Sequence, residues 1–249
     1  DIEAIEAAFR LFLRLIPRPG WLVVCADDVR AAALAQDAHS RAITYGLSQQ
    51  ATIRGEFLGQ SGGMQRLAVY KEGRRWGEFT VPLPGRHNLR NVLAALAVAD
   101  ILGLDVPVLA EALREVRGVR RRLEVFLEAD GVTFIDDFAH HPTAIRETVH
   151  AVRSRWPARR LLVLLEPRSN TMVTKRFQEE LPGALADADE VCIGPIYRAD
   201  RIPEENRLDR ARLVEDLRKT HTQAWSEDRI EAIVDAVRTT AHPGDIVLI

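Results

Sequence analysis

The chain has 249 residues, of which 47% are hydrophobic and 28% charged, and its formal net charge is −2. This size suits one large domain or two ordinary ones, and the even spread of Lys and Arg argues against the basic stripe that a nucleic acid requires. No apolar run approaches the roughly 18 residues that span a bilayer, and no signal-peptide pattern is present. We therefore expect a cytoplasmic protein with neither nucleic acid nor membrane as a partner.

The first half of the chain shows a mixed pattern of helices and strands. Apolar residues recur at helical spacing near the start, and later segments rich in β-branched and aromatic residues flank a Gly-containing turn. The predicted elements are helices over 1–16 and 29–36 on either side of a strand over 21–26, antiparallel strands within 52–82 that include 65–70 and 76–81 around a hairpin turn at 71–75, and helices over 85–99 and 106–116.

Beyond Gly118 strands and helices alternate. Such alternation is typical of parallel strands joined by crossover helices. We therefore predict an α/β protein with a mixed α/β domain over 1–118 and a Rossmann-like domain with a mainly parallel sheet over 119–249. The predicted strands are 132–135, 161–165, 190–193 and 245–249, and the predicted helices are 141–156, 175–185, 208–220 and 228–240.

The two cysteines, Cys25 and Cys192, lie in short apolar segments that read as strands. A cysteine in such a context usually behaves as a small buried hydrophobe. We therefore predict two buried thiols rather than a disulfide or a catalytic pair.

The segment 136–143 is the most informative in the chain, because it places Asp136, Asp137, His140 and His141 between an apolar strand and an amphipathic helix. In α/β sheets, ligands bind beyond the carboxyl ends of strands. This segment occupies such a position, so we predict a functional site there. Asp and His also bind metals, but adjacent histidines at a helix start point in different directions, and no metal site is predicted.

Two further strands end in polar segments, 166–171 and 194–198. Parallel strands would bring these segments to one edge of the sheet, next to 136–143. Polar residues also populate ordinary loops, and this second interpretation is preferred for residues 197–201.

Three motifs together tie the chain to a family. Gly85-Arg86-His87-Asn88-Leu89-Arg90-Asn91, followed by Ala94-Ala95, resembles a helix start in the central domain of Mur ligases. The segments 121–124 and 136–143 resemble the start and the first strand end of the C-terminal domain of that family. Within the family, residues 166–172 resemble the murein peptide ligase branch. The resemblance covers essentially the whole chain and implies the C-terminal half of a central ATP-binding domain over 1–118 and a C-terminal domain, truncated at its end, over 119–249.

The resemblance implies an ATP- and Mg²⁺-dependent enzyme of peptidoglycan recycling. It would join the lactyl carboxylate of UDP-N-acetylmuramate, through an acyl phosphate, to the amine of L-Ala-γ-D-Glu-meso-diaminopimelate. The resemblance implies two steps: transfer of the γ-phosphate of ATP to the carboxylate, and attack of the amine on the resulting acyl phosphate. Cationic groups are needed because negative charge accumulates during both steps. Two alternatives stay open: the UDP-N-acetylmuramate:L-alanine ligase of peptidoglycan biosynthesis, and a non-catalytic nucleotide- or peptide-binding module. Folylpolyglutamate and cyanophycin synthetases share the architecture but are disfavoured by residues 140–143 and 166–172.

The family's nucleotide contacts carry over to the helix that starts after Gly85. Asn91 would read adenine, since a carboxamide offers one donor and one acceptor in a plane. Asn88 would support that turn, although Asn is also a common helix N-cap. His87 would lie near the nucleotide or would satisfy a neighbouring carbonyl.

The remaining roles fall in the second domain. Arg122 would bind the ATP phosphates through its fork of donors, and Asp137 would accept hydrogen bonds from the ribose hydroxyls. His140 would donate to the transferred phosphoryl group or order the amine, while His141 and Pro142 would start the next helix. Four residues would bind the peptide substrate, with the first pairing with a carboxylate: Arg168, Ser169, Asn170 and Thr171.

The chain also departs from the family pattern. The sequence contains no G-x-x-G-K-[ST] motif, the loop with which the family cradles phosphates, and no counterpart of the N-terminal uridine-nucleotide domain. We therefore expect an internal fragment of a ligase roughly twice as long, and we expect this fragment alone to be inactive.

Overall fold

The structure is a computed structural model and describes residues 2–220 and 222–249. The chain divides into two compact units, residues 1–117 and 118–249, and each contains its own sheet. The described residues therefore confirm the predicted α/β class, with a mixed sheet in the first unit and a mainly parallel one in the second. Over the described ranges, every helix is too short or too polar to cross a membrane.

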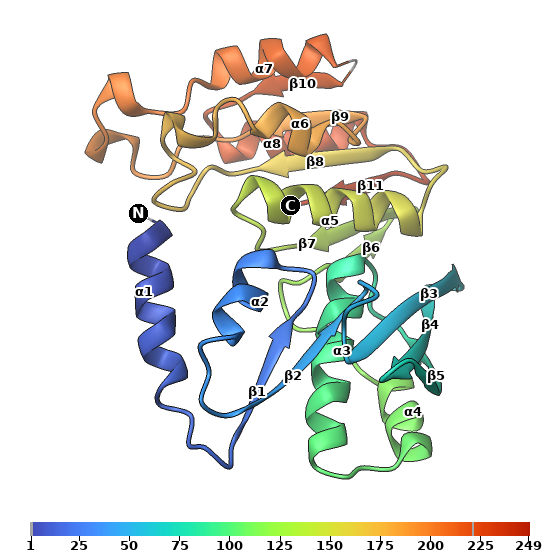
Figure 1. Cartoon of the computed structure of the whole chain (residues 1–249). Helices are drawn as coiled ribbons and strands as arrows, with labels where there is room; N and C mark the ends of the chain where they lie inside the picture. Colours follow the sequence, from blue (N-terminus) through green and yellow to red (C-terminus); the bar gives the residue numbers. More distant parts are fainter. Residues whose placement is uncertain (1, 221) are drawn as a thin grey trace. The chain divides into compact units, whose positions relative to one another are not determined.

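The first unit contains a sheet in the order β1-β2-β3-β4-β5 (Figure 1). Strands β1 to β3 are parallel to one another, and β3 to β5 are antiparallel. Its elements are α1 (Ile2–Leu13), β1 (Trp21–Cys25), α2 (Val29–Ala35), β2 (Arg41–Gly46), β3 (Ile53–Ser61), β4 (Met64–Lys71), β5 (Arg74–Val81), α3 (Arg86–Ile101) and α4 (Val106–Arg114).

Two local features of the sequence build this unit. The predicted hairpin forms between β4 and β5, where Glu72 and Gly73 both have positive φ, of 50° and 77°, as the tightest hairpin turns require. Helix α3 then packs Leu89, Leu93 and Leu96 into the core, where all three are at most 1% exposed. This packing places the polar start of α3 at the end of a rigid element.

The second unit contains a sheet in the order β10-β9-β8-β11-β7-β6, in which only the β6–β7 pair is antiparallel among the described strands. Its elements are β6 (Glu124–Ala129), β7 (Val132–Asp136), α5 (Pro142–Arg155), β8 (Leu161–Leu165), η1 (Lys175–Phe177), α6 (Leu181–Leu185), β9 (Glu190–Ile193), η2 (Ala199–Arg201), η3 (Glu204–Asn206), α7 (Arg210–Lys219), β10 (Gln223–Ser226), α8 (Ile230–Thr240) and β11 (Ile246–Leu248).

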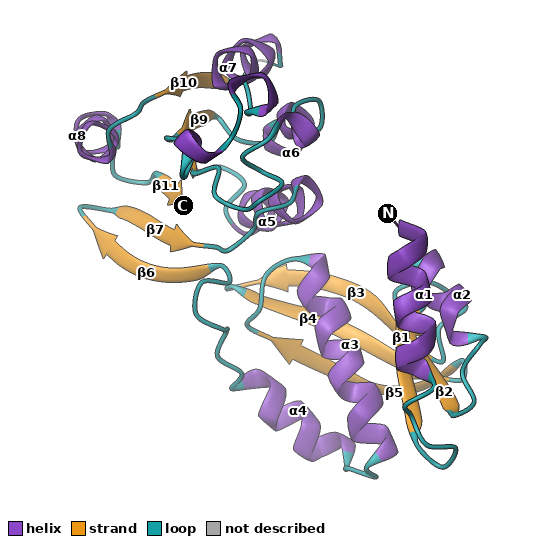
Figure 2. Cartoon of the chain, turned by 90° about the vertical axis from the view of Figure 1, so that its left-hand side faces the viewer, coloured by secondary structure: helices purple, strands orange, loops and turns teal. Residues whose placement is uncertain are grey.

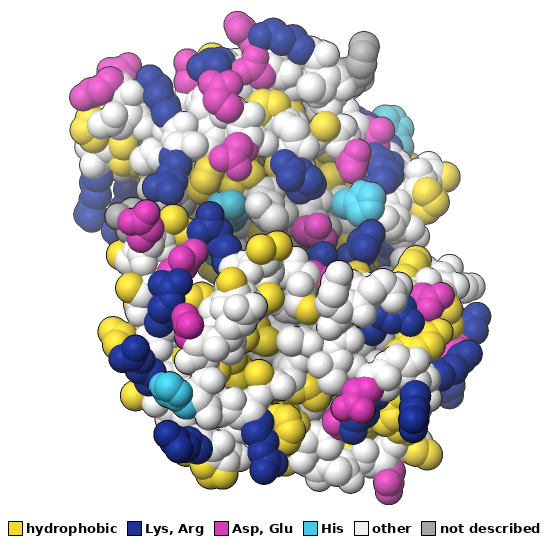
Figure 3. All heavy atoms as spheres, viewed as in Figure 1, with side chains coloured by type: hydrophobic (Ala, Val, Ile, Leu, Met, Phe, Trp, Pro, Cys, Tyr) yellow, Lys and Arg dark blue, Asp and Glu magenta, His cyan; other side chains and the backbone are white. Residues whose placement is uncertain are grey.

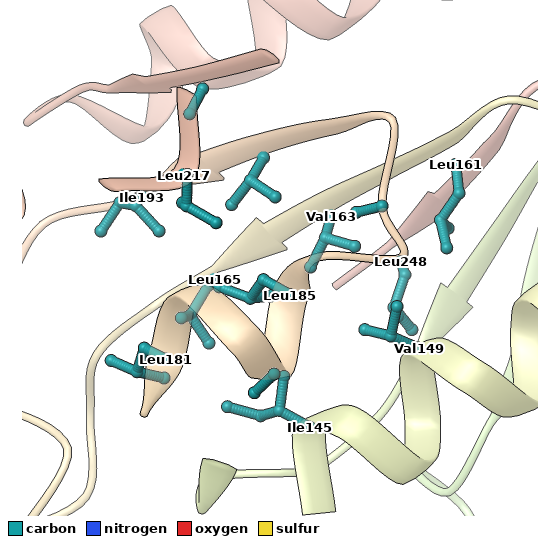
Figure 4. Close-up of a cluster of buried hydrophobic side chains, with 14 of the residues drawn as sticks. Ile145, Val149, Leu161, Val163, Leu165, Leu181, Leu185, Ile193, Leu217 and Leu248 are labelled. Atoms are coloured by element: carbon teal, nitrogen blue, oxygen red, sulfur yellow. The ribbon is translucent and has the colours of Figure 1, made fainter. Parts of the chain in front are cut away.

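Helices cover both faces of this second sheet (Figure 2). Helices α5, α6 and α7 pack on one face, where Leu161, Val163 and Leu165 of β8 join the main core cluster (Figure 4). Leu162 of β8 points to the opposite face, where it packs with Ile233 and Val237 of α8. Because alternate residues of a strand face opposite sides and both sides are buried, β8 reads as an unbroken apolar run.

Several predicted elements differ from the observed ones. The single helix predicted over 175–185 is wrong: a short 3-10 turn over Lys175–Phe177 precedes a five-residue helix that begins at Leu181. Between them the Gln178 side chain bonds to the backbone of Asp209, both donating to its carbonyl and accepting from its N–H. The sequence also failed to predict β2, β6 and β10 as separate strands. Both cysteines are free thiols, but only Cys192 is fully buried and Cys25 is half-buried.

Candidate functional site

The predicted site in the second unit lies where parallel strands end. The loops that follow β7, β8 and β9 leave parallel strands at the same edge of the sheet. They are joined by hydrogen bonds: the Ser169 hydroxyl donates to the carbonyl of His140 at 3.4 Å, and the Tyr197 amide donates to the carbonyl of Pro167 at 3.0 Å. The segments 136–143 and 166–171 are therefore brought together, as parallel pairing requires.

Asp137 is the most highly connected acid at this edge. Its Oδ2 accepts from the amide of Leu123 at 2.8 Å, and its Oδ1 accepts from the amide of Ala139 at 2.9 Å and from the Thr148 hydroxyl at 3.1 Å. A carboxylate offers about four acceptor positions, so the protein itself fills most of those of Asp137. The residue expected to bind ribose is thus also an internal anchor.

The proposed phosphate-binding arginine lies in an unusual turn. Arg121 and Leu123 have φ values of 58° and 52°, so left-handed residues flank Arg122 on both sides. Such a conformation costs about 1–2 kcal/mol for a residue with a Cβ. The guanidinium carbons of Arg121 and Arg122 lie 5.0 and 5.5 Å from the centroid of the Phe138 ring, within range of a cation–π contact. Arg122 is exposed and lies beside the ring of Phe138, which is itself 46% exposed.

The adjacent histidines have different environments. Nδ1 of His140 lies 2.8 Å from the carbonyl of Phe138, so Nδ1 carries a hydrogen that it donates to this carbonyl, and the side chain is exposed. His141 is the N-cap of α5, where its Nδ1 accepts from the amide of Thr143 at 3.2 Å, and Pro142 is the first helical residue. The prediction that these two residues start the helix is confirmed.

The segment after β8 forms a short polar turn. Arg168 pairs with Glu166 at 3.2 Å, and its guanidinium carbon lies 4.3 Å from the centroid of the Tyr197 ring. The Ser169 hydroxyl accepts from the amide of Met172 at 3.2 Å, while Asn170 and Thr171 are exposed. The contact of Tyr197 with Arg168 was not expected from the sequence, which gave no functional weight to residues 197–201.

The start of α3 carries the residues predicted to contact the nucleotide in the first unit. Gly85 precedes the helix with a φ of 91°, a value that favours glycine. The interpretation of Asn88 as an N-cap is wrong, since it is the third helical residue and its Nδ2 donates to the carbonyl of Pro84 at 2.7 Å. Asn91 is exposed and its Nδ2 donates to Oδ1 of Asn88 at 3.3 Å, while His87 is half-buried in the first turn.

Asp27, in the loop after β1, anchors the same helix start. Its carboxylate accepts from the amides of Leu47 and Ser48 and from Nε of Arg90 at 3.0 Å. Burial raises the pKa of Asp27, but the two amides and the Arg90 guanidinium outweigh it and hold that pKa below its ordinary value. A Cβ on Gly46 would come within 2.5 Å of the Asp27 carboxylate, so only glycine leaves room for this arrangement.

The predicted residues therefore form two sets, one in each unit. His87, Asn88 and Asn91 lie on α3 of the first unit, and the other predicted residues lie at the strand ends of the second unit. Within the described ranges, His, Cys, Asp and Glu side chains form no cluster of three that would hold a metal ion. Lys and Arg side chains are scattered among acidic ones on the face shown in Figure 3.

Two family models match the chain. The model described as Mur ligase middle domain matches residues 1–99, and the model described as Mur ligase, glutamate ligase domain matches residues 121–249. The second match alone covers more than half of the 249 residues.

Curated relatives match most or nearly all of the chain. The UDP-N-acetylmuramate–L-alanine ligase of Geobacter sulfurreducens is 38% identical over 99% of this chain and 53% of that protein. The enzyme of the same name from Solidesulfovibrio magneticus is 39% identical over 81% of this chain and 44% of that protein. The chain thus spans about half the length of the curated relatives it matches.

Solved structures share the fold. The UDP-N-acetylmuramate–alanine ligase of Thermotoga maritima superposes with a TM-score of 0.73 at 24% identity, over 91% of this chain and 46% of that one. A murein peptide ligase from Psychrobacter arcticus gives a TM-score of 0.65 at 23% identity, over 99% of this chain and 51% of that one. At these identities the likeness establishes the fold alone.

Proposed function

Because the chain belongs to the Mur ligase family, we propose that its protein is an ATP-dependent ligase that joins the lactyl carboxylate of UDP-N-acetylmuramate to the amine of L-alanine. The observation that carries this proposal is the near full coverage of the chain by relatives 33–38% identical that are named UDP-N-acetylmuramate–L-alanine ligases. These matches favour the alanine ligase, which the sequence left open as an alternative. They disfavour the murein peptide ligase, which was the first expectation from the sequence.

ATP, when bound, supplies the phosphoryl group that activates the carboxylate. The residues that would hold it are present in part: Asn91 offers an exposed amide for adenine, and Arg122 offers an exposed guanidinium for phosphate oxygens. Asn88, bonded to Pro84, fixes the helix start from which Asn91 projects. Among the described residues, no three His, Cys, Asp or Glu side chains form a cluster that could hold a metal ion, and we assign these residues no step that involves magnesium.

His140 would act on the amine. Its Nδ1 donates to the carbonyl of Phe138, so in its neutral form the ring would present Nε2 as an acceptor. An acceptor is suited to bind an N–H of the incoming amine and to hold its lone pair toward the carboxyl carbon. This geometry favours ordering of the amine over donation to the phosphoryl group.

The turn after β8 would bind the carboxylate of the amine substrate. The guanidinium carbon of Arg168 lies over the Tyr197 ring, 4.3 Å from its centroid, and the guanidinium already pairs with one carboxylate, that of Glu166. A fork of donors held in this way matches a second carboxylate in a plane. Ser169, Asn170 and Thr171 would offer further polar groups to the substrate from the same turn.

A tripeptide ligase is the second candidate, and residues 166–172 are the observation that favours it. Their sequence resembles the murein peptide ligase branch, whose substrate is L-Ala-γ-D-Glu-meso-diaminopimelate. The two candidates share the activation step and differ only in the amine, so the amine substrate decides between them.

The test is an assay of ADP release by the whole protein with ATP, magnesium and UDP-N-acetylmuramate, with either L-alanine or the tripeptide as amine. We expect turnover with L-alanine. Turnover with the tripeptide alone would replace the proposal with the second candidate, and turnover with neither would favour a non-catalytic binding module.

A matched pair of variants links this assay to the site. Arg168→Lys keeps the charge but loses the planar fork and its stacking on Tyr197, whereas Arg176→Lys changes an exposed arginine of η1. We expect the first to raise KM for the amine by about tenfold, corresponding to about 1.4 kcal/mol, and the second to leave it unchanged. Equal KM values for both would remove Arg168 from the substrate site.

A further inference from the structure

Arg122 lies between two residues whose backbone conformation is rare. Among the described residues only five other than glycine have a positive φ, and Arg121 and Leu123 are two of them. Side chains disfavour this conformation, so it persists only where the surroundings hold it. The two left-handed residues fix the direction in which the chain presents the side chain between them.

Four hydrogen bonds hold this turn, and in one of them the amide of Arg122 donates to the carbonyl of Val119 at 3.1 Å. The amide of Leu123 donates to Oδ2 of Asp137 at 2.8 Å, and the amide of Phe138 donates to the carbonyl of Arg121 at 2.9 Å. The amide of Arg121 donates to Oε2 of Glu124, also at 2.8 Å. The carboxylate of Asp137 is the link that comes from the strand end, because Asp137 directly follows β7.

The Asp137 carboxylate is in turn held by helix α5. Thr148, 6% exposed, donates from its hydroxyl to Oδ1 at 3.1 Å, and the amide of Ala139 donates to the same oxygen. A buried hydroxyl needs a partner, and this one is directed at the anchor of the turn. A continuous chain of hydrogen bonds therefore runs from α5 through Asp137 to Leu123.

We propose that Asp137 and Thr148 are positioning residues, which lock the turn 121–123 and so aim the Arg122 guanidinium at the phosphates of the nucleotide. This inference rests on the proposed function in one respect, the phosphate as the target of Arg122. It differs from the expectation that Asp137 binds ribose, because here Asp137 acts through the Leu123 backbone. It also assigns a role to Thr148, which lies outside every motif of the sequence.

The first test measures the turn itself. Thr148→Val removes the hydroxyl at nearly constant volume, and Thr148→Ser keeps it. Initial rates of trypsin cleavage after Arg121 and Arg122, read by mass spectrometry in the whole folded protein, report how often the turn opens. We expect cleavage in the Val variant to rise about tenfold, the effect of one lost hydrogen bond to a charged group, with the Ser variant near the wild type. Cleavage after Arg117, in the exposed segment before the turn, serves as the internal reference.

The second test separates positioning from ribose binding. Dissociation constants for ATP and for 2′,3′-dideoxy-ATP are measured for wild type, Asp137→Asn, Arg122→Ala and the double variant. Positioning predicts that Asp137→Asn weakens both nucleotides equally and adds nothing once Arg122 is absent. Ribose binding predicts instead that Asp137→Asn weakens the binding of ATP but not of the dideoxy nucleotide. It also predicts that the weaker binding of ATP persists when Arg122 is absent.

The outcomes distinguish the two proposals. An unchanged cleavage rate in Thr148→Val, or a loss confined to the nucleotide that carries ribose hydroxyls, overturns the positioning role whatever the enzyme's substrates are. A wild-type protein that binds no ATP contradicts the proposed function. If trypsin cleavage of Thr148→Val still rises in that case, Asp137 and Thr148 do hold the turn, but the nucleotide phosphates are not the target of Arg122.

Discussion

Arg90 and Asp27 connect helix α3 to the loop after β1, with Nε of Arg90 3.0 Å from Oδ2 of Asp27 although the two residues are 63 positions apart. Asn91 follows Arg90 directly, and so its position depends on this pair. The pair therefore ties a proposed adenine contact to the parallel part of the first sheet.

Replacement of Asp27 by Asn should lower the free energy of unfolding by about 2 kcal/mol at pH 7, the range for hydrogen bonds to a charged group. The pKa of Asp27 is lowered in the folded state. Its stabilisation is therefore complete above the unfolded value of about 3.9 and is lost as pH falls through the folded value. Urea titrations at several pH values should show the two proteins converging below about pH 4.

Asp37→Asn is the control for that experiment. Asp37 pairs with Arg10, and its side chain is 57% exposed, whereas that of Asp27 is 13% exposed. A surface pair contributes about 0–1 kcal/mol, so the control should be close to wild type. Equal losses for both variants, or a loss for Asp27→Asn that stays constant down to pH 3, would contradict the assigned role.

Two asparagines on one helix should behave differently. Asn88→Ala removes the bond to the carbonyl of Pro84 and should cost about 1 kcal/mol of stability. Asn91→Ala changes an exposed residue and should leave thermal unfolding unchanged while weakening ATP binding about fivefold, as expected for one hydrogen bond. Calorimetric titration with ATP measures the affinity of each variant, and thermal melts measure its stability. An unaltered ATP affinity in Asn91→Ala would show that Asn91 is not part of the nucleotide site.

Cys192 should resist alkylation in the folded protein. Burial, with the nearby Glu190 and Glu227 charges, raises the pKa of its thiol to about 12, and the side chain is 0% exposed. The reactive thiolate is therefore scarce at pH 8 and also inaccessible. Peptide mapping after iodoacetamide treatment should find Cys192 unmodified until urea unfolds the protein, and modification at the rate of a free thiol under native conditions would contradict this placement.

The core on the α5–α6–α7 face of the second sheet should be sensitive to a single truncation. Leu185 of α6 is 0% exposed and lies in the cluster of Figure 4, whereas Val234 of α8 is 49% exposed. Leu185→Ala should destabilise by about 2–5 kcal/mol and Val234→Ala by less than about 0.5 kcal/mol. Chemical denaturation gives both values, and comparable losses would mean that the packing of α6 is not as described.

The sequence predicted those elements whose pattern is local. Strand β8 is an unbroken apolar run, and α3 repeats its apolar residues at helical spacing, so both were identified. Strand β10 has four residues and is a strand only because it pairs with β9, a tertiary contact without local signal. The break between Phe177 and Leu181 was missed for a similar reason, since Gln178 bonds to Asp209, which is distant in sequence.

The same limit applies to the candidate site. The polar residues of 136–143 could be placed at a strand end, because that location follows from alternation of strands and helices. The bonds of Asp137 to Leu123, Ala139 and Thr148 could not be predicted, because the first two partners are backbone amides and the third is one of many threonines. The contacts of Phe138 with Arg121 and Arg122 could not be predicted from the sequence either, although the sequence places Phe138 within the segment 136–143.

The strand order of the second unit determines when its sheet can form. Strand β11 lies between β7 and β8, and Ile246 pairs with Thr133 on one side and Leu161 on the other. During synthesis, β7 and β8 emerge from the ribosome long before the strand that separates them. The two must stay apart, or pair wrongly, until residues 246–248 arrive. Pairing between strands so distant in sequence makes folding slow. Until β11 is in place, β7 and β8 expose unpaired edges and apolar surface, which chaperones bind during translation.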